Sequence, residues 1–592
     1  MSQEEDVLGK AYDNRLMRRL LTYLWPYKVQ AVLALLAIIA NSAAQLAPPY
    51  LTKVAIDRYI GAGNLDGLGE LALVYCVVLL ASFGLDYAQT WLMQMTGQRI
   101  MYDLRTEIYS RLQRLDLRFY DRNPVGRLMT RVTSDVDVLN DLFTSGVIAI
   151  FGDVFTLVGI MIVLLVMDWQ LALISFAVLP LIVLVTQWFR RNVRDSYRTV
   201  RTWIARINAF LQENITGMTT VQLFRREGVN FARFDDINGK HRDANIDSIF
   251  YYAVFYPAIE IVGAMAASLI IWYGGLRVIA GTLTLGALVA FLQYSSRFFR
   301  PISDMSEKFN ILQSAMASSE RIFKLLDEPI VIHDTPAPVR RNPAKAPHIV
   351  FDHVWFAYNG EDYVLRDVSF DVRPGQRIGI VGATGSGKTT MINLLMRFYD
   401  VSKGRILVDG VDIRELAIED VRAMFALVLQ DVHLFSGTIE SNVRLGKPLD
   451  RSDVTRAATA VRAQRFVDQL PEGLDTRLGE RGTTLSVGQR QLLSFARALA
   501  FDRPVLVLDE ATSSVDTETE VIIREALEVL MRGRTTVAIA HRLSTIQDMD
   551  TILVLHKGVL RESGTHQELL ARRGIYFKLY QLQFRDAMER TA

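Results

Sequence analysis

Long apolar segments are confined to the first half of the chain. A helix needs about 20 residues to cross about 30 Å of hydrocarbon, and six successive runs reach that length: 29–51, 71–96, 145–167, 169–189, 249–276 and 283–302. Each run taken alone could be a buried helix of a soluble protein, above all the runs that hold Asp86, Asp153 or Glu260. Six in succession instead predict an all-α transmembrane domain over residues 1–330.

Basic residues predict which connections face the cytoplasm. The connections at 98–140 and 190–247 are rich in arginine, and Lys and Arg accumulate on the cytoplasmic side of a membrane. We therefore expect both connections, and both ends of this multi-pass chain, on the cytoplasmic side of the inner membrane. The short connections near 57–67, Asp168 and Gly281 are expected outside.

The two long connections should continue the spans as helices beyond the bilayer. Helix breakers interrupt them at Pro124 and at Gly217. At these two places we expect the chain to turn and to expose a short docking helix.

A different pattern follows residue 330. The segment 331–347 is rich in proline and lacks apolar periodicity, which predicts a linker. In 348–592, short strand-like runs alternate with helical stretches, which predicts an α/β domain with a largely parallel sheet. The expected fold class is thus a multi-domain membrane protein with six transmembrane helices and an α/β domain.

Charge and cysteine content exclude some functions. The 66 basic residues nearly balance the 64 acidic ones, so whole-chain charge gives no sign of nucleic acid as a partner. Cys76 is the single cysteine, which excludes an intrachain disulfide and a metal site built on cysteines.

A P-loop follows the strand-like run RIGIV and opens a helical stretch. It consists of Gly382, Ala383, Thr384, Gly385, Ser386, Gly387, Lys388 and Thr389. Glycines allow backbone N–H groups to surround phosphates, Lys388 can neutralise the β and γ oxygens, and Thr389 can ligate Mg²⁺. A chance glycine-rich turn is the alternative. We expect this loop, together with Thr390, to bind ATP with Mg²⁺.

Two carboxylates end a strongly apolar run at 505–508. Asp509 and Glu510 come where ligands usually meet a parallel sheet. Asp509 suits the Mg²⁺ shell, and Glu510 can then orient or deprotonate the water that attacks the γ-phosphate. Without the P-loop, an acidic cap of the next helix would be an equally good interpretation.

The chain resembles the ATP-binding cassette family. The residues that resemble the family signature are Leu485, Ser486, Val487, Gly488 and Gln489. The resemblance covers 348–580 through the cassette motifs. Six spans fused ahead of one cassette look like a bacterial exporter half-transporter of the multidrug or lipid type.

This resemblance implies roles for further residues. Tyr358 would stack on adenine, Gln430 would sense Mg²⁺ and the attacking water, and His541 would contact the γ-phosphate. Glu510, His541 and Gln430 would form the catalytic set. Ser513 and Asp516 would belong to the loop that follows the catalytic strand.

The implied Mg²⁺ ligands are Thr389, Gln430 and Asp509. The signature residues, including Ser486 and Gly488, would close over ATP bound to the opposite cassette, so a dimer is implied. Val487 stands where the family usually has glycine. This departure leaves open whether the chain pairs with itself or with a different half-transporter.

The resemblance implies ATP-driven export of a hydrophobic or amphiphilic small molecule by alternating access. A lipid flippase or an exporter of metal conjugates is the alternative within transport. A membrane-anchored ATPase that acts as a regulator or an ATP-gated channel is an alternative of another class. Glu260 is expected to face the translocation pathway, with packing against another span as the competing interpretation.

Overall fold

The computed structural model describes residues 13–61, 63, 66–509, 517–539 and 546–582. Contacts divide the chain into two compact units. Unit 1 comprises Met1–Gln113 and Val125–Glu328, and unit 2 comprises Arg114–Pro124 and Pro329–Ala592. A short segment that lies between two helices of unit 1 in the sequence therefore belongs, by its contacts, to unit 2.

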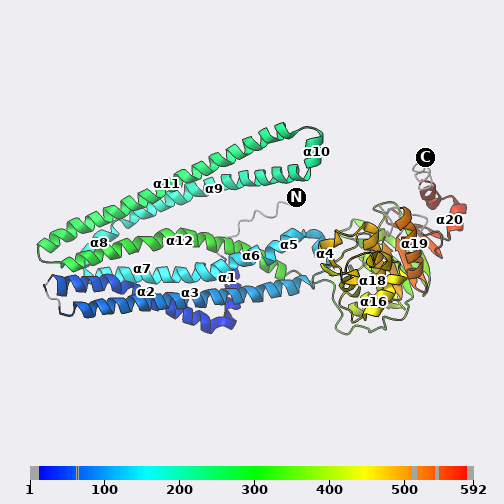
Figure 1. Cartoon of the computed structure of the whole chain (residues 1–592), viewed down its shortest axis with the longest axis horizontal. Coiled ribbons are helices and arrows are strands. Elements are labelled where there is room, and N and C mark those ends of the chain that lie inside the picture. The colour runs from blue at the N-terminus through cyan, green and yellow to red at the C-terminus, as the bar shows by residue number, and fades with distance from the viewer. Residues whose placement is uncertain (1–12, 62, 64–65, 510–516, 540–545, 583–592) are drawn as a thin grey trace. The chain divides into compact units, whose positions relative to one another are not determined.

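Unit 1 is helical. Its helices are α1 (Asn14–Leu24), α2 (Lys28–Val54), α3 (Leu68–Leu112), α5 (Val125–Val132), α6 (Ser134–Asp141), α7 (Val147–Met167), α8 (Trp169–Phe176), α9 (Leu179–Thr216), α10 (Met218–Leu223), α11 (Glu227–Ile279) and α12 (Leu285–Leu326), with short irregular turns η1 (Trp25–Tyr27), η2 (Ala55–Ile60) and η3 (Leu142–Gly146). Helix α2 packs along α3, α9 packs along α11, and α12 packs against α2, α7 and α11 (Figure 1).

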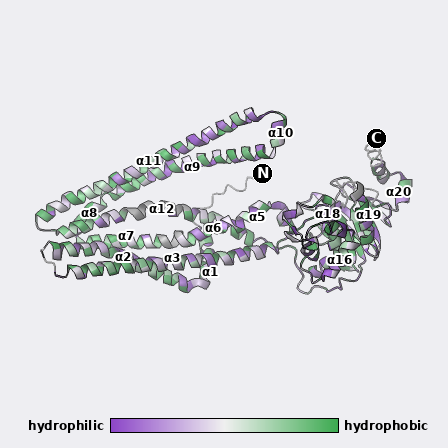
Figure 2. Cartoon of the chain, in the orientation of Figure 1, coloured by the Kyte–Doolittle hydropathy of each residue, from purple (hydrophilic) through white to green (hydrophobic). Residues whose placement is uncertain are grey.

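The apolar runs of the sequence lie in these long helices. Within the described residues, five helical segments are long and apolar enough to cross a membrane: Asn14–Ile60, Leu68–Leu112, Ile150–Met167, Trp169–Thr216 and Glu227–Ile279. They contain the first, second, fourth and fifth predicted spans and residues 150–167 of the third. The sixth predicted span, 283–302, falls in α12 and stays a prediction. Hydrophilic positions become frequent in α9 and α11 toward α10, as expected for helices that continue beyond a bilayer (Figure 2).

Polar residues end or break the helices where the sequence predicts turns. Asp168 separates α7 from α8, and its carboxylate accepts a hydrogen bond of 2.9 Å from the Leu171 N–H. The same carboxylate pairs with Arg277 at 2.5 Å, which joins two connections predicted to lie on one side of the membrane. Helix α10 begins directly after Gly217. This confirms one of the two predicted short helices.

The second short helix belongs to unit 2. Helix α4 (Leu117–Arg122) ends just before Pro124, and Asn123 between them is extended, with φ −118° and ψ 111°. A residue that precedes proline is pushed out of the helical region in this way. The turn at Pro124 is therefore confirmed.

Acidic side chains within the predicted spans differ in their surroundings. Asp153 forms an ion pair with Lys308, and Asp86 accepts a 3.3 Å hydrogen bond from Asn41. Pairing lowers the free-energy cost of a charge inside a bilayer. Glu260 is exposed on α11 and forms no ion pair with a described residue.

Unit 2 holds three sheets among its described residues, the smallest of which is the antiparallel pair β7-β8. Of the other two, the larger sheet has the order β12-β11-β3-β10-β9-β6, and the smaller has the order β2-β1-β4-β5. The strands are β1 (Ile349–Ala357), β2 (Tyr363–Val372), β3 (Arg377–Gly382), β4 (Lys403–Val408), β5 (Val411–Asp412), β6 (Phe425–Val428), β7 (Gly437–Thr438), β8 (Arg477–Leu478), β9 (Val505–Asp509), β10 (Thr535–Ile539), β11 (Thr551–His556) and β12 (Val559–Gly564).

The helices of unit 2 pack against strands of the larger sheet or against one another. They are α13 (Lys388–Leu395), α14 (Ile418–Ala423), α15 (Ile439–Arg444), α16 (Arg451–Ala460), α17 (Gln464–Val467), α18 (Val487–Phe501), α19 (Thr517–Met531) and α20 (His566–Arg572). Strands β11, β3, β10, β9 and β6 run parallel, as predicted. Buried aliphatic and aromatic side chains pack in two clusters on β-strands and helices. The predicted fold class is confirmed.

The first strands of unit 2 depart from the predicted parallel arrangement. Strand β1 pairs with β2 and with β4 in antiparallel register. Only five residues, 358–362, join β1 to β2, whereas a parallel connection needs about a dozen. The short loop therefore imposes a hairpin.

The segment 331–347 is attached to unit 2 over much of its length. Val339 exchanges backbone hydrogen bonds with Glu415 and Ala417, at 2.9 and 3.2 Å. The guanidinium group of Arg341 donates to the carboxylate of Asp409 at 2.8 Å. The proline-rich composition indicates a linker, but it does not reveal these contacts.

Candidate functional site

The P-loop of unit 2 has the geometry of an anion-binding turn. It leaves the end of β3 at Gly382 and enters α13 at Lys388. Gly385 and Gly387 have φ of +78° and +102°, a region that other residues rarely adopt. A Cβ atom on Gly387 would also lie 2.6 Å from the Leu365 side chain. Both glycines are thus required for the turn.

Polar groups converge inside this loop. The Lys388 side chain is buried, and its Nζ donates to the carbonyl oxygens of Gly382 at 2.8 Å and Ala383 at 3.3 Å. The buried Oγ of Ser386 has no hydrogen-bond partner among the residues that the structure describes, although buried hydroxyl groups normally have one. Thr389 is exposed beside them. A cation, an unpaired hydroxyl and the start of a helix suit a nucleotide phosphate chain.

The parallel sheet brings further predicted site residues to the same edge. In the register of β9 and β10, Asp509 lies opposite Ile539, and Ile539 lies opposite Ile380 of β3. Gln430 comes two residues after the end of β6, which pairs with β9. Carboxyl ends of neighbouring parallel strands meet at one edge. The sheet therefore places Asp509 and Gln430 on the P-loop side.

Four predicted residues lie outside the described part of the chain. They are Glu510, Ser513, Asp516 and His541. Glu510 comes directly after Asp509 in the sequence, and His541 comes two residues after the end of β10. Their place at the edge that carries the P-loop stays a prediction.

Tyr358 packs close to the P-loop helix. Its hydroxyl group lies 3.1 Å from Oγ1 of Thr390, the third residue of α13. Its ring makes edge contacts with Phe356 and Tyr399, at centroid distances of 4.8 and 5.2 Å. These contacts fix a half-buried aromatic ring next to the loop, as a partner for adenine requires.

The signature residues form the start of α18. Ser486 caps this helix: its Oγ accepts from the Gln489 N–H at 3.2 Å, and Gln489 Oε1 accepts from the Ser486 N–H at 2.9 Å. This reciprocal cap holds the first turn in place. Ser486 and Val487 are exposed and Gly488 is buried. The helix start is thus open to a ligand from outside the chain.

Known proteins match the whole chain. It is 38% identical over 588 residues to an uncharacterized ABC transporter ATP-binding protein, YknV, of Bacillus subtilis, covering 99% of this chain and 97% of that protein. The family model of the ABC transporter transmembrane region matches residues 31–302, and the ABC transporter model matches residues 365–513. The chain is an ABC transporter.

Two further relatives specify its architecture. An ATP-dependent lipid A-core flippase of Syntrophus aciditrophicus is 37% identical over 574 residues, covering 96% of this chain and 95% of that protein. A solved bacterial Atm1-family ABC exporter with ATP bound matches with a TM-score of 0.76 and 29% identity, covering 96% and 99% of the two chains. The ABC transporter is an exporter of the half-transporter type, in which ATP hydrolysis drives transport.

Helix α4 of this ABC transporter contacts the loop that carries Tyr358. Arg122 donates a 2.7 Å hydrogen bond to Oδ1 of Asn359, and Arg118 donates a 3.4 Å bond to the carbonyl oxygen of Tyr358. Sequence analysis predicts a docking helix near Pro124, but it does not identify these partners. The alternation of Asp and Arg over 116–122 is the signal that marks α4 as a polar contact surface.

A second contact joins α4 to the end of the P-loop helix. The hydroxyl group of Tyr399, four residues after α13, donates to the carboxylate of Asp121. Burial and this hydrogen bond raise the pKa of Tyr399 above its ordinary value. The hydroxyl group therefore keeps its proton and acts as a donor at neutral pH.

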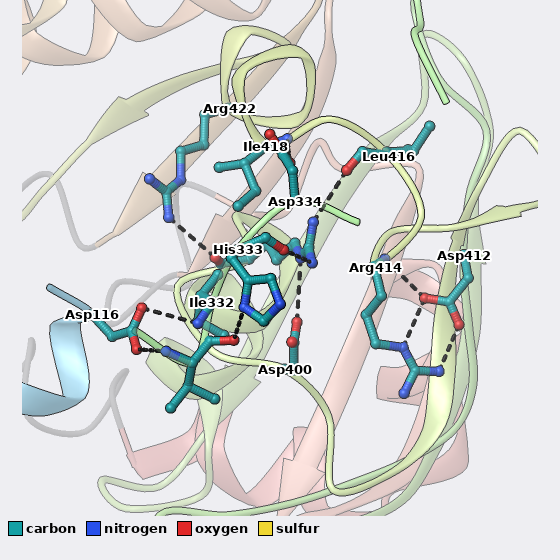
Figure 3. A network of polar contacts seen from close by, with 12 residues as sticks. Asp116, Ile332, His333, Asp334, Asp400, Asp412, Arg414, Leu416, Ile418 and Arg422 are labelled. Carbon is teal, nitrogen blue, oxygen red and sulfur yellow. Dashed lines mark hydrogen bonds and ion pairs between the residues drawn. The ribbon is translucent and has the colours of Figure 1, made fainter. Parts of the chain in front are cut away.

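The residue that precedes α4 is tied to the segment that leads into unit 2. The carboxylate of Asp116 accepts hydrogen bonds from the backbone N–H groups of Val331 and Ile332, at 2.7 and 3.1 Å (Figure 3). The next residue, His333, accepts a 3.1 Å bond from the guanidinium group of Arg397. The linker and α4 are thus held to one another.

Arg397 anchors this network in unit 2. It follows α13, is 3% exposed and has φ of +49°. Its guanidinium group also donates to the Leu416 carbonyl at 3.1 Å and pairs with Asp400 at 3.3 Å (Figure 3). Burial and the nearby charge of Arg397 lower the pKa of Arg422. Polar contacts therefore run from the P-loop helix to α4 through a buried arginine.

Proposed function

We propose that this exporter moves a hydrophobic or amphiphilic small molecule out of the cytoplasm by alternating access. Two half-transporters form the working unit, and ATP binding closes their cassettes into a sandwich. Closure switches the membrane helices from an inward to an outward arrangement, because ATP has a higher affinity for the closed state. Hydrolysis then resets the cycle.

The observation that carries this proposal is the position of α4. This helix lies in sequence between α3 and α5 of the membrane unit, yet its side chains contact Asn359 and Tyr399 beside the P-loop. A movement of the nucleotide loop is therefore transmitted to a segment that is covalently continuous with two membrane-unit helices. An anchored ATPase without transport would not need that connection.

The ATP site residues take the roles that the motifs imply. The P-loop residues from Gly382 to Thr390 bind the phosphates, and Tyr358 stacks on the base. Thr389, Gln430 and Asp509 hold Mg²⁺, which the cluster of oxygen ligands at one sheet edge suits. Glu510 activates the attacking water and His541 contacts the γ-phosphate.

The dimer follows from the position of the signature. Ser486 and Gly488 stand at the start of α18, where Ser486 is exposed and caps the helix. They complete the ATP site of a second subunit in this proposal. Val487 is 43% exposed, so a second cassette can contact it. A homodimer and a pairing with a different half-transporter both satisfy this geometry.

The substrate class is supported by the membrane helices. The exposed faces of α3 and α11 are apolar, and Glu260 adds a carboxylate to the exposed face of α11. We propose that Glu260 faces the pathway and favours cationic or polar-headed amphiphiles. Lipid flipping has support from the flippase relative. Export of metal conjugates stays the other alternative within transport.

Accumulation in inverted membrane vesicles tests the proposal. A fluorescent amphiphilic cation and a short-chain fluorescent phospholipid are the probes, with and without ATP. ATP-dependent accumulation or flipping that the Lys388→Ala variant lacks supports transport. A regulator would give ATP hydrolysis alone. An ATP-gated channel would only equalise the tracer, so either result would reject export.

A further inference from the structure

Unit 1 carries a groove outside the proposed transport machinery. Its volume is about 420 Å³ and its lining residues include Tyr27, Trp91, Gln94, Gln98, Arg99 and Tyr102. All of these except Tyr27 belong to α3, and Tyr27 ends the turn η1 that precedes α2. The hydroxyl group of Tyr27 donates to Asp103 at 2.7 Å, which fixes the wall opposite α3.

The groove lies on the exposed face of α3. Trp91 is 54% exposed and Tyr102 is 71% exposed, whereas Ile100, Met101 and Leu104 on the other side of the helix are 1% exposed. Spacings of three and four residues put the lining side chains on one face. The same spacing continues toward the N-terminus of α3 as a stripe of exposed apolar side chains: Leu73, Val77, Leu80, Phe83 and Tyr87.

This stripe changes character at the depth of a membrane surface. The 20 residues from 72 to 91 span about 30 Å, the thickness of the hydrocarbon layer. Trp91 then lies at the boundary, and its ring stacks on Tyr87 at 6.3 Å. Arg99 lies about 12 Å further along the helix, in the layer of lipid head groups. Aromatic rings above a cation are typical of a membrane interface.

Arg99 brings a positive charge to this level, near the carboxylate of Asp103 that accepts from Tyr27. Arg99 is exposed and forms no ion pair with a described residue, whereas Arg105, six residues later, pairs with Asp137 at 2.5 Å. The N-terminal segment that leads into Tyr27 is also basic, with Arg15 and Arg18 in α1 and Lys28 at the start of α2, as in basic helices that lie on membranes. An anion is the missing partner of Arg99.

We propose that this groove binds an anionic phospholipid of the inner leaflet. Arg99 and the amide groups of Gln94 and Gln98 hold the phosphate, and Trp91 and Tyr102 flank the glycerol backbone. The acyl chains follow the apolar stripe above Trp91. The assignment to the inner leaflet rests on the proposed orientation of the membrane unit. The groove itself does not involve the ATP site.

Native mass spectrometry of the purified full chain tests this site. The protein is titrated with dioleoyl phosphatidylglycerol and, separately, with dioleoyl phosphatidylcholine. We expect tighter binding of the anionic lipid in the wild-type protein. Arg99→Gln should lower that affinity about tenfold, toward the value for phosphatidylcholine, because a hydrogen bond to a charged group is lost. Trp91→Ala should weaken both lipids.

Arg105→Gln is the matched control. It makes the same charge change on the same helix but on another face, and it should leave both affinities unchanged. Nucleotide affinity equal to the wild-type value shows that each variant is folded. Equal binding of phosphatidylglycerol by wild type and Arg99→Gln, or an equal loss in Arg105→Gln, overturns the proposal.

Two further measurements separate the lipid from other occupants. Glycerol 3-phosphate at the same concentration should not displace the lipid, because it lacks the acyl chains; displacement would indicate a site for soluble phosphate esters and overturn the proposal. Gln98→Cys on a Cys76→Ser background should not cross-link two copies of the chain. An efficient cross-link would show that a second copy covers this face, and would also overturn the proposal.

Discussion

The hydroxyl group of Tyr399 donates a hydrogen bond to the carboxylate of Asp121. Tyr399 follows the P-loop helix, and Asp121 belongs to a helix that is continuous in sequence with the membrane unit. Tyr399 is only 7% exposed, so its ring is part of the core while its hydroxyl group serves the contact. The bond therefore joins nucleotide binding to the segment through which we propose that transport is driven.

Removal of this bond should uncouple the two halves. We expect Tyr399→Phe to retain ATP affinity, since the ring packing is unchanged, and to lose most of the stimulation of ATP hydrolysis by a transported amphiphile. A hydrogen bond to a charged group contributes about 1.5–3 kcal/mol. ATP affinity and stimulated turnover, measured in proteoliposomes, check this outcome.

A double-mutant cycle provides the control. Asp121→Asn should behave like Tyr399→Phe, and the double variant should be no worse than either, because all three lack the same bond. Tyr363→Phe alters a tyrosine of the same unit whose hydroxyl group forms no hydrogen bond with a described residue, and it should be neutral. Additive losses in the double variant would show that the two residues act separately.

Asp409 should make the stability of unit 2 depend on pH. Burial opposes ionisation of Asp409, but hydrogen bonds from the His348 N–H and the Arg341 guanidinium group outweigh it and hold the pKa below its ordinary value. A pKa that is lower in the folded state than in the unfolded state stabilises the fold at pH values above the unfolded-state pKa. That contribution is lost as the pH falls through the folded pKa, below about 4.

Thermal unfolding of Asp409→Asn checks this linkage. Because the carboxylate is 37% exposed, we expect a loss of about 1 kcal/mol at pH 7. The difference from wild type should shrink as the pH is lowered toward 3.5. Asp371→Asn, an exposed carboxylate with ion pairs of 3.6 Å, should change little at either pH. A deficit that persists at low pH would exclude the charge as the cause.

Local sequence patterns predict the P-loop, the helical membrane unit and the strands of unit 2. The glycines of the P-loop and the apolar run that ends in Asp509 are patterns of consecutive residues, so they can be read from the sequence. The structure gives Gly385 and Gly387 positive φ and makes the run strand β9. Spacing also predicts the turns at Asp168 and Pro124. Strand-like composition alone predicts parallel pairing for β1 and β2. The short connection between them instead imposes an antiparallel hairpin.

Contacts between distant residues are not accessible in this way. Asp121 and Tyr399 are 278 residues apart, and Asp116 and Val331 are 215 residues apart. A polar residue in a docking helix accepts many possible partners, so its composition marks a surface without identifying what it contacts. Glu260 is exposed in the single chain, so its partners in the proposed dimer are a matter of assembly and not of local sequence.

Labelling with an impermeant maleimide tests the proposed membrane orientation. Gly69→Cys and Gly228→Cys, both on a Cys76→Ser background, place a thiol at exposed glycines near the start of α3 and α11. Neither glycine has a positive φ, and a Cβ atom at either would meet nothing within 4 Å. We expect the thiol at 69 to react in intact cells and the thiol at 228 to react only after lysis. The reverse pattern would invert the topology.

Glu260→Gln tests the proposed substrate pathway. The substitution keeps the size of an exposed side chain on α11 and removes its charge. If one charge contact is lost, we expect cationic amphiphiles to stimulate ATP hydrolysis only at about tenfold higher concentration. Stimulation by neutral amphiphiles should stay unchanged. Unchanged stimulation by both classes would place Glu260 outside the pathway.

The role proposed for Glu510 separates chemistry from nucleotide binding. Asp509 ends β9 at the P-loop edge of the sheet, and Glu510 is the next residue in the sequence. We propose that its carboxylate acts on the attacking water without entering the Mg²⁺ shell. Glu510→Gln keeps the side-chain size and removes most of its basicity. General-base catalysis contributes about 10²–10⁴ in rate, so turnover should fall by that factor while ATP affinity stays near the wild-type value.

Lys388→Ala should show the opposite behaviour. The ammonium group of Lys388 lies inside the P-loop, within 2.8 Å of the Gly382 carbonyl, so its loss should abolish ATP binding and cassette closure together. Glu510→Gln should instead accumulate the closed dimer, because the step that opens it is blocked. Nucleotide affinity, turnover and cross-linking of cassettes through a cysteine at Val487 distinguish the two variants. Turnover of Glu510→Gln near the wild-type rate would reject Glu510 as the catalytic carboxylate. Retained ATP binding alone cannot sustain hydrolysis when the general base is missing.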